Sequence, residues 1–129
     1  MARNKLVSPF LKWVGGKRQI MPAIEQHLPR AIKSYIEPFI GGGAVLFHLQ
    51  PKNAIINDFN LELVNVYQVI KDDLENLIVD LQKHKNESEY FYEIRALDRT
   101  EAFEKLSDVA RASRIIYLNK TCYNGLYRV

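Results

Sequence analysis

The sequence predicts an α/β fold in which a small parallel β-sheet comes first and a helical region follows. Two short apolar runs flank a triple-glycine turn, an order typical of a strand–helix–strand unit. Near residue 60 the apolar residues change from short runs to a helical period of three and four. With 129 residues, of which 47% are hydrophobic, the chain is long enough for one ordinary folded domain, which excludes a wholly disordered protein.

The first part of the chain contains the elements of a βαβ unit in order. Residues 32–37 form the first expected strand, and the glycines at 41–43 form a tight turn after it. Residues 44–50 form a short helix that Pro51 ends, and residues 54–57 form the second strand.

Two strands are too few for a parallel sheet, which normally has several strands and helices over both faces. We therefore expect this sequence to be the N-terminal portion of a longer protein. Residues 1–60 are assigned to the sheet domain and residues 61–129 to a helical domain or a part of one.

The helical domain is predicted from three apolar patterns. The first is one long helix with a buried stripe, formed by Leu63, Tyr67, Ile70, Leu74, Leu77, Ile78 and Leu81, and a polar segment at 83–88 ends it. The second contains Tyr90, Phe91, Ile94 and Leu97, and the third contains Phe103, Leu106, Val109, Ala110, Ile116 and Tyr117. On the third helix, Arg111 and Arg114 are expected on the face opposite the apolar residues.

The charge distribution indicates a partner that carries phosphates. Residues 1–33 hold seven basic residues and one acid, Glu25, and residues 111–129 hold four basic residues and no acid. The segment between them is acidic, with a net charge of −7, so two basic ends flank an acidic centre. Basic clusters of this kind bind nucleic acids, although small basic proteins without such a partner are also common.

Composition excludes several other classes of protein. No apolar run reaches the roughly 18 residues that a membrane-spanning helix needs, and the N-terminus lacks a secretory signal pattern. Cys122 is the single cysteine, and His27, His48 and His84 lack the spacing of metal ligands. The sequence therefore predicts a cytoplasmic protein without a metal site.

The triple-glycine turn is a candidate ligand-binding loop, because glycine lets a ligand approach the backbone N–H groups that begin the next helix. The dinucleotide fingerprint requires a glycine where Leu46 stands, which disfavours pyrophosphate binding. Asp58 ends the second strand, where a carboxylate can accept hydrogen bonds from ribose hydroxyls. The alternative is a bare turn, with Asp58 capping the following helix.

A second candidate segment contains Trp13, Gly15, Gly16 and Lys17. An indole face can support a flat or cationic group, and an ammonium can pair with a carboxylate. Taken alone, Trp13 is an ordinary core residue and Lys17 a solvated charge. Together with the glycine loop and Asp58, the set suits a ligand with an adenosine, a sulfonium and an amino-acid carboxylate, which is S-adenosylmethionine.

The C-terminal segment, residues 119–128, has the side chains of nucleic-acid readers. Its Asn-Gly turn presents Tyr123 and Asn124 on one side and Leu126 and Arg128 on the other. Arginine and asparagine can read base edges, while tyrosine and leucine can stack on bases or wedge between them. The alternative is an ordinary surface hairpin with a buried tyrosine.

Four ordered motifs resemble the Dam-type DNA adenine-N6 methyltransferases, with the strongest likeness to the subgroup of Dam-like methylases found in DpnII-type restriction-modification systems. They are Lys12-Trp13-Val14-Gly15-Gly16-Lys17, Glu37-Pro38-Phe39-Ile40-Gly41-Gly42-Gly43, Asn57-Asp58-Phe59-Asn60 and Tyr123-Asn124-Gly125-Leu126-Tyr127-Arg128. The resemblance covers essentially the whole sequence. It implies a partial Rossmann-like, S-adenosylmethionine-dependent methyltransferase sheet with an inserted helical target-recognition domain.

The resemblance also implies roles for individual residues. The expected cofactor-binding residues are Trp13, Gly15, Gly16, Lys17, Glu37, Pro38, Phe39, Gly41, Gly43 and Asp58. The expected partner is double-stranded DNA that contains GATC, bound by a monomer. The residues expected to contact this DNA are Lys12, Arg111, Arg114, Lys120, Tyr123, Asn124, Leu126 and Arg128.

One motif of this family is missing. Methyl transfer to the amino group of adenine needs an Asp-Pro-Pro-Tyr type of motif, and no two of the five prolines are adjacent. The catalytic residues are therefore expected beyond Val129, and the 129 residues alone are expected to be inactive. Two alternatives remain open, namely a non-enzymatic nucleic-acid-binding protein and an S-adenosylmethionine-dependent enzyme that acts on RNA or a small molecule.

Overall fold

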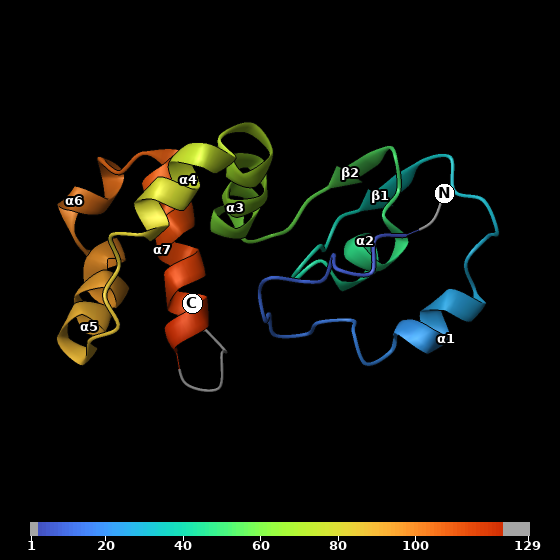
Figure 1. Cartoon of the computed structure of the whole chain (residues 1–129), viewed down its shortest axis with the longest axis horizontal. Helices are drawn as coiled ribbons and strands as arrows, with labels where there is room; N and C mark the ends of the chain where they lie inside the picture. Colours follow the sequence, from blue (N-terminus) through green and yellow to red (C-terminus); the bar gives the residue numbers. More distant parts are fainter. Residues whose placement is uncertain (1–2, 123–129) are drawn as a thin grey trace. The chain divides into compact units, whose positions relative to one another are not determined.

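The computed structural model describes residues 3–122 and divides the chain into two compact units, Met1–Phe59 and Asn60–Val129 (Figure 1). The division falls where the hydrophobic pattern changes from short runs to a helical period. Each unit has its own buried core, and each is described separately below. Within residues 3–122, no helix has the length and apolar character needed to cross a membrane.

The first unit contains the predicted strand–helix–strand order. Its elements are α1 (Met21–Gln26), β1 (Tyr35–Glu37), α2 (Ala44–Leu49) and β2 (Ala54–Ile56). The two strands are parallel, and Tyr35, Ile36 and Glu37 pair with Ala54, Ile55 and Ile56 in that order. The prediction of a small parallel sheet is confirmed, although β1 is shorter than the expected strand at 32–37.

The apolar core of the first unit is small. Leu11, Met21, Ile40 and Val45 are buried, so the core joins the N-terminal segment, α1, the glycine turn and α2. The backbone N–H of Asn4 donates a hydrogen bond of 2.9 Å to the side-chain oxygen of Gln50, and the side-chain nitrogen of Gln50 donates one of 2.8 Å to the carbonyl of Asn4. These bonds fasten the N-terminal segment to the carboxyl end of α2.

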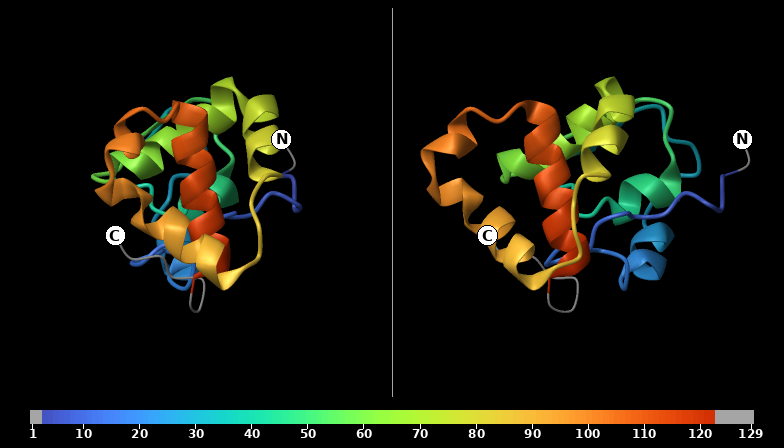
Figure 2. Two further views of the ribbon diagram at one scale, coloured as in Figure 1. Left: turned by 90° about the vertical axis from the view of Figure 1, so that its left-hand side faces the viewer. Right: turned by 60° about the vertical axis from the view of Figure 1, so that its left-hand side comes forward.

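The second unit is helical and is built around one long helix. Its elements are α3 (Leu61–Asp72), α4 (Leu74–Leu81), α5 (Ser88–Ala96), the 3₁₀ turn η1 (Leu97–Arg99), α6 (Glu101–Glu104) and α7 (Asp108–Thr121). Helix α7 packs against α3, α4 and α5, and both views in Figure 2 show it running between them. Its buried residues, from Ala112 to Asn119, lie on nearly every side of the helix rather than on one stripe.

The long helix predicted for residues 63–81 is wrong, because the helix breaks at Asp73. The backbone of Asp73 has φ −148° and ψ 46°, which is outside the helical region. Its N–H still bonds to the carbonyl of Val69, and its carboxylate accepts a hydrogen bond of 2.8 Å from Asn76. Asp73 therefore ends α3 and begins α4, and the apolar period continues across the break because Leu77 is buried in the same core.

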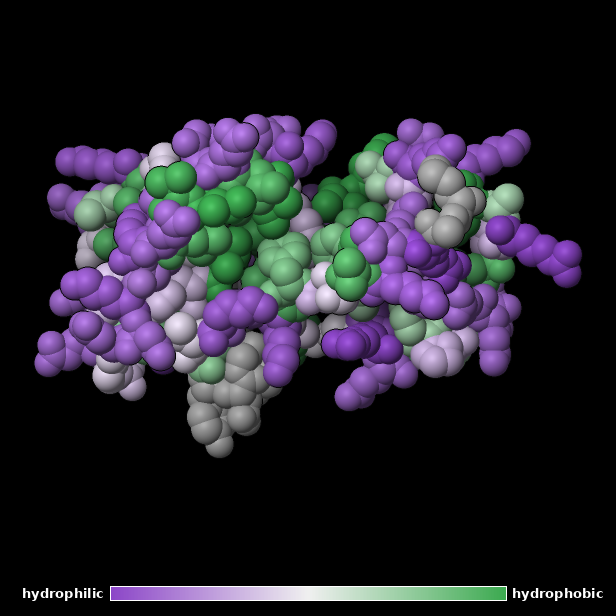
Figure 3. Space-filling view, in the orientation of Figure 1, coloured by the Kyte–Doolittle hydropathy of each residue, from purple (hydrophilic) through white to green (hydrophobic). Residues whose placement is uncertain are grey.

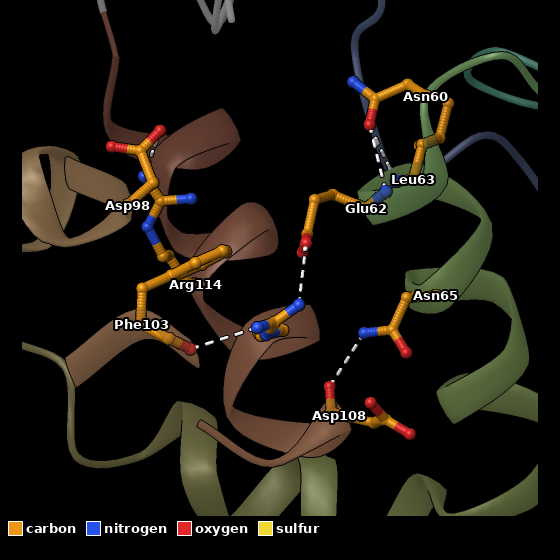
Figure 4. A network of polar contacts seen from close by, with 9 residues as sticks. Asn60, Glu62, Leu63, Asn65, Asp98, Phe103, Asp108 and Arg114 are labelled. Atoms are coloured by element: carbon orange, nitrogen blue, oxygen red, sulfur yellow. Dashed lines mark hydrogen bonds and ion pairs between the residues drawn. The ribbon is translucent and has the colours of Figure 1, made fainter. Parts of the chain in front are cut away.

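The prediction that Arg111 and Arg114 lie on a face of the helix opposite its apolar residues is also wrong, because α7 is buried on nearly every side. Arg114 is only 3% exposed, and its guanidinium donates hydrogen bonds of 2.9 Å to the carbonyls of Ile94 and Arg95. Its charge is balanced by Asp98 at 3.5 Å (Figure 4). Arg111 is partly buried and bonds to the carbonyl of Phe103.

Phe103 explains the position of both arginines. The guanidinium carbon of Arg111 lies 4.2 Å from the centre of the Phe103 ring, and that of Arg114 lies 5.4 Å from it. Arg111 also forms an ion pair of 3.4 Å with Glu62 on α3. The two arginines therefore join α3, α5 and the α6 turn to α7 inside this unit, and the DNA contacts expected of them stay predictions.

His84 closes the loop between α4 and α5 onto the central helix. Its ring stacks on Tyr117 with centroids 4.6 Å apart. Its two ring nitrogens lie 2.6 Å from the hydroxyl of Tyr90 and 2.7 Å from that of Ser113. Burial lowers the pKa of His84 below its ordinary value of 6.5, and the positive charge of Lys83 lowers it further, while Asp80 opposes the shift.

This shift predicts a loss of stability in mild acid. Because the folded state holds His84 neutral, the unfolded chain binds a proton more readily once the pH falls below about 6.5. The free energy of unfolding is therefore expected to be constant at higher pH and to fall as the pH drops below about 6.5. Urea unfolding monitored by circular dichroism across this range measures the effect. The variant His84→Gln should flatten the dependence, and an unchanged slope in that variant would show that another group is responsible.

Candidate functional site

The glycine turn lies at the carboxyl ends of both strands of the first unit. The N–H of Ile40 bonds to the carbonyl of Asn57 at 2.9 Å, which joins the turn to the segment that follows β2. Gly41 and Gly43 have φ values of +52° and +82°, a region that favours glycine, and Gly43 is the N-terminal cap of α2. Carboxyl ends of parallel strands are where open α/β sheets bind ligands.

Asp58 lies two residues after the end of β2 and holds the glycine turn. Its Oδ2 accepts a hydrogen bond of 3.0 Å from the N–H of Gly41. The alternative, in which Asp58 caps the following helix, is wrong because the side chain of Asn60 accepts from the N–H groups of Glu62 and Leu63. Figure 4 shows this cap at the start of α3. Asp58 therefore belongs to the glycine turn rather than to the helix.

The Trp13 segment packs against the same turn. A Cβ atom built on Gly41 would lie 3.8 Å from Cδ1 of the Trp13 indole. A Cβ atom built on Gly42 would lie only 2.7 Å from the carbonyl oxygen of Leu11, so the two backbones touch where Gly42 has no side chain. Trp13 is partly exposed, and its carbonyl accepts a hydrogen bond of 3.1 Å from Gly16 in the next turn.

Lys17 is an ion-paired residue, so its interpretation as a solvated charge is wrong. Its Nζ lies 3.1 Å from Oε1 of Glu37 and donates a hydrogen bond of 2.7 Å to the carbonyl of Phe39. The carboxylate of Glu37 is buried and also accepts a hydrogen bond from the hydroxyl of Tyr35. Burial and this carboxylate raise the pKa of Tyr35.

The Lys17–Glu37 pair was not foreseen from the sequence, although both residues were expected near a ligand. The sequence offers one hint about the environment of Glu37 and none about its partner Lys17. Tyr35 and Glu37 are two positions apart on a strand, so their side chains share a face of the sheet. An ammonium has three N–H donors, and within residues 3–122 two groups accept from Lys17. One donor is therefore available to a ligand carboxylate next to the glycine turn.

The structure brings together most of the residues expected at a cofactor. Trp13, Lys17, Glu37, the glycine turn and Asp58 lie in one region of the first unit, and Pro38 and Phe39 are exposed beside it. This region combines an aromatic ring, a paired ammonium and an acid held on a glycine turn. Such a set can bind a small ligand with both apolar and charged parts.

The residues expected to contact DNA are described only in part. Lys12 and Lys120 are exposed, as phosphate contacts require. Tyr123, Asn124, Leu126 and Arg128 lie outside residues 3–122, so their predicted roles stay predictions.

Comparison with known proteins identifies a family and several relatives. The model of the D12 class of N6 adenine-specific DNA methyltransferases matches residues 13–129. The type II methyltransferase M1.LlaDCHI of Lactococcus lactis subsp. cremoris is 47% identical over 100% of this chain and 46% of its own length. The type II methyltransferase M.MjaIII of Methanocaldococcus jannaschii is 45% identical over 95% of this chain and 48% of its own.

A DNA adenine methylase of Serratia marcescens is 37% identical over 92% of this chain and 44% of its own length. The chain therefore spans about half the length of the relatives it matches.

Proposed function

Because the chain belongs to the D12 class of N6 adenine-specific DNA methyltransferases, we propose that it provides the cofactor pocket and part of the DNA-reading surface of an enzyme that methylates N6 of adenine in GATC. The proposed methyl donor is S-adenosylmethionine. The observation that supports the pocket is the hydrogen bond from Gly41 to Asp58, which joins the glycine turn to the acid after β2.

The residues present fit S-adenosylmethionine. In our proposal, Asp58 accepts hydrogen bonds from the ribose hydroxyls while it holds Gly41, since one carboxylate can accept several donors. Lys17, positioned by Glu37, directs its remaining N–H toward the amino-acid carboxylate. The indole of Trp13 supports the ligand beside Gly41, where the absence of a side chain permits close approach.

When bound, S-adenosylmethionine supplies an electrophilic methyl group on a sulfonium. The residues of this chain orient that donor, and none of the described side chains is proposed as the base. The group that accepts hydrogen bonds from the adenine amino group is proposed to lie in the Asp-Pro-Pro-Tyr type of motif that this sequence lacks.

On the DNA side, Lys12 and Lys120 are proposed to contact phosphates, because both are exposed cations. Tyr123 and Asn124 are proposed to enter the duplex beside the target adenine, and Leu126 and Arg128 to read GATC. The unit that begins at Asn60 is proposed as the target-recognition domain.

Asp58→Ala is expected to weaken S-adenosylmethionine binding by about 10- to 100-fold, since each hydrogen bond to a charged group contributes roughly 1.5–3 kcal/mol. Isothermal titration calorimetry with the 129-residue chain measures this change. The matched control is Glu75→Ala, which removes an exposed carboxylate from the first turn of α4 and should leave the affinity unchanged. Equal binding by both variants and the unaltered chain would rule out this role of Asp58.

The substrate is tested with an enzyme that contains this chain and the missing motif. Transfer of a radiolabelled methyl group is expected on a GATC duplex and not on a duplex with the same bases in permuted order or on RNA. Methylation of RNA in preference to the duplex would support the alternative of an RNA-modifying enzyme. Binding of DNA without any binding of S-adenosylmethionine would support a non-enzymatic DNA-binding protein.

A further inference from the structure

A hollow in the first unit lies at the end of α2 that is remote from the glycine turn. It has a volume of about 680 Å³, and its lining includes Leu49, Gln50, Pro51 and Lys52, where the chain leaves α2 and approaches β2. Within residues 3–122, it is lined by none of the residues assigned to the cofactor. Because Gly43 caps the opposite end of α2, the length of this six-residue helix, about 9 Å, separates the hollow from the glycine turn.

Three cations from separate segments line this hollow. Arg3 lies in the N-terminal segment, Arg30 follows α1, and Lys52 precedes β2. The N–H of Tyr35 bonds to the carbonyl of Asn53 at 3.0 Å, which brings the segment after Arg30 beside the segment after Lys52. In the view of Figure 3, hydrophilic residues cover most of the surface around the N-terminal segment and α1. The fold therefore brings together positive charges that are far apart in the sequence.

The positive charge of the hollow is only partly balanced. Among the described residues that line it, Glu25 is the only acid, and its Oε1 already lies 3.4 Å from Arg3 and 3.1 Å from Nε2 of His48. In the part of the chain that the structure describes, the side chains of Arg30 and Lys52 have neither an ion pair nor a hydrogen bond. A guanidinium and an ammonium are therefore available to an anion from solution.

Much of the remaining lining is apolar and indicates the kind of anion. The apolar side chains are those of Leu28, Pro29, Ile32, Leu49 and Pro51. A guanidinium can bind two oxygens of one phosphate, and an ammonium binds a phosphate as a point charge. Apolar side chains beside these cations can cover the face of a ring, and the volume of the hollow lies in the range of small-molecule sites. The combination favours a phosphate that carries a ring over inorganic phosphate.

We propose that this hollow binds an organic phosphate monoester with a ring, which is the chemistry of a mononucleotide. The proposal is independent of the proposed function, because the hollow and the glycine turn lie at opposite ends of α2. A DNA backbone carries phosphates of similar chemistry, so the test includes both sources. The alternative is that the cations only neutralise the carbonyl end of α2, which requires no ligand.

The test is titration of the isotope-labelled 129-residue chain with uridine monophosphate in a buffer without phosphate, followed by nuclear magnetic resonance. This probe has a phosphate and a ring but lacks the adenine, sulfonium and amino acid of S-adenosylmethionine. We expect saturable shifts of the amide signals of Arg30, Gln50 and Lys52, whereas those of Gly41 and Asp58 stay unchanged. Inorganic phosphate should shift the same signals but bind about 10-fold more weakly, because it has no ring to cover the apolar lining.

Arg30→Gln/Lys52→Gln removes both unpaired cations and should weaken the binding of uridine monophosphate by at least about 10-fold. The matched control is Arg18→Gln/Lys33→Gln, which removes one arginine and one lysine from exposed positions of the same unit outside the hollow. It should leave the affinity within about twofold of the unaltered chain, since distant exposed charges are screened by salt. All these side chains are exposed, so neither variant should change the circular dichroism spectrum.

Three results would overturn the proposal. They are no binding of uridine monophosphate by the unaltered chain, equal affinity of the two double variants, and tighter binding at the same residues by a DNA duplex without GATC, which would assign the hollow to the DNA backbone. The calorimetric titration of S-adenosylmethionine distinguishes these failures from failure of the proposed function. A chain that binds the cofactor through Asp58 but not uridine monophosphate refutes only the second site.

Discussion

Gly42→Ala is expected to destabilise the first unit by about 3 kcal/mol, at the upper end of the range for overpacking a tight contact. The added methyl group would lie 2.7 Å from the carbonyl oxygen of Leu11, a distance that real side chains do not tolerate. The methyl group is attached directly to the backbone, and the atom that it would meet is a backbone carbonyl oxygen. The strain can therefore be relieved only by moving the Trp13 segment away from the glycine turn. We therefore also expect loss of measurable S-adenosylmethionine binding.

Urea unfolding followed by Trp13 fluorescence measures the change, since this is the single tryptophan. Gly41→Ala is the matched control in the same turn. Its Cβ atom would meet only an ordinary contact of 3.8 Å with Trp13, and its φ of +52° costs roughly 1 kcal/mol for alanine. If both variants lose the same stability, the close approach to Leu11 does not set the packing of this turn.

Arg114→Met is expected to destabilise the second unit by about 3 kcal/mol. Methionine fills a similar volume but leaves the carbonyls of Ile94 and Arg95 without their donors and the charge of Asp98 without its partner. Since α7 packs against α3, α4 and α5, loss of this link should lower the unfolding midpoint of the whole unit. Thermal unfolding monitored by circular dichroism at 222 nm, the usual wavelength for helix content, provides a measurement at about neutral pH.

Arg114→Lys should recover less than half of this loss, because an ammonium cannot reproduce the planar fork that binds two carbonyls at once. Lys120→Ala, at the exposed end of the same helix, should leave stability within about 0.5 kcal/mol of the unaltered chain. An Arg114→Met variant that keeps full stability and loses only DNA affinity would show that Arg114 acts at the DNA surface and does not hold the unit together.

The elements of the first unit were predictable because local chemistry determines them. Glycines allow the left-handed backbone at Gly41 and Gly43, and Pro51 follows the end of α2, so the turn and the helix boundary follow from residue type alone. The parallel pairing of the strands then follows from the helix that connects them. The region around Asp58 was predictable for the same reason, since the end of the second strand must return to the turn.

The features that sequence reasoning missed depend on contacts between distant residues. The helix break at Asp73 could not be predicted from the residues around it. The apolar period continues across the break, because the period reports which side chains are buried and not the backbone conformation. Arg114 has the charge of a surface residue, and only the carbonyls of α5, 19 and 20 residues earlier, make its burial favourable. Likewise, Lys17 pairs with an acid 20 residues away, and no spacing rule links the two.

The pairing of Lys17 with Glu37 has a consequence for how ionic strength affects the site. A lone ammonium attracts an anionic ligand over a distance comparable with the Debye length, so its contribution is screened by salt. Here a buried carboxylate 3.1 Å away already cancels most of that long-range field, and what the ammonium offers to a ligand is a short, directional hydrogen bond. The affinity for the cofactor at this site should therefore vary little between dilute buffer and physiological salt. The affinity for a polyanion bound through Lys12 and Lys120 should instead fall over the same range of salt concentration.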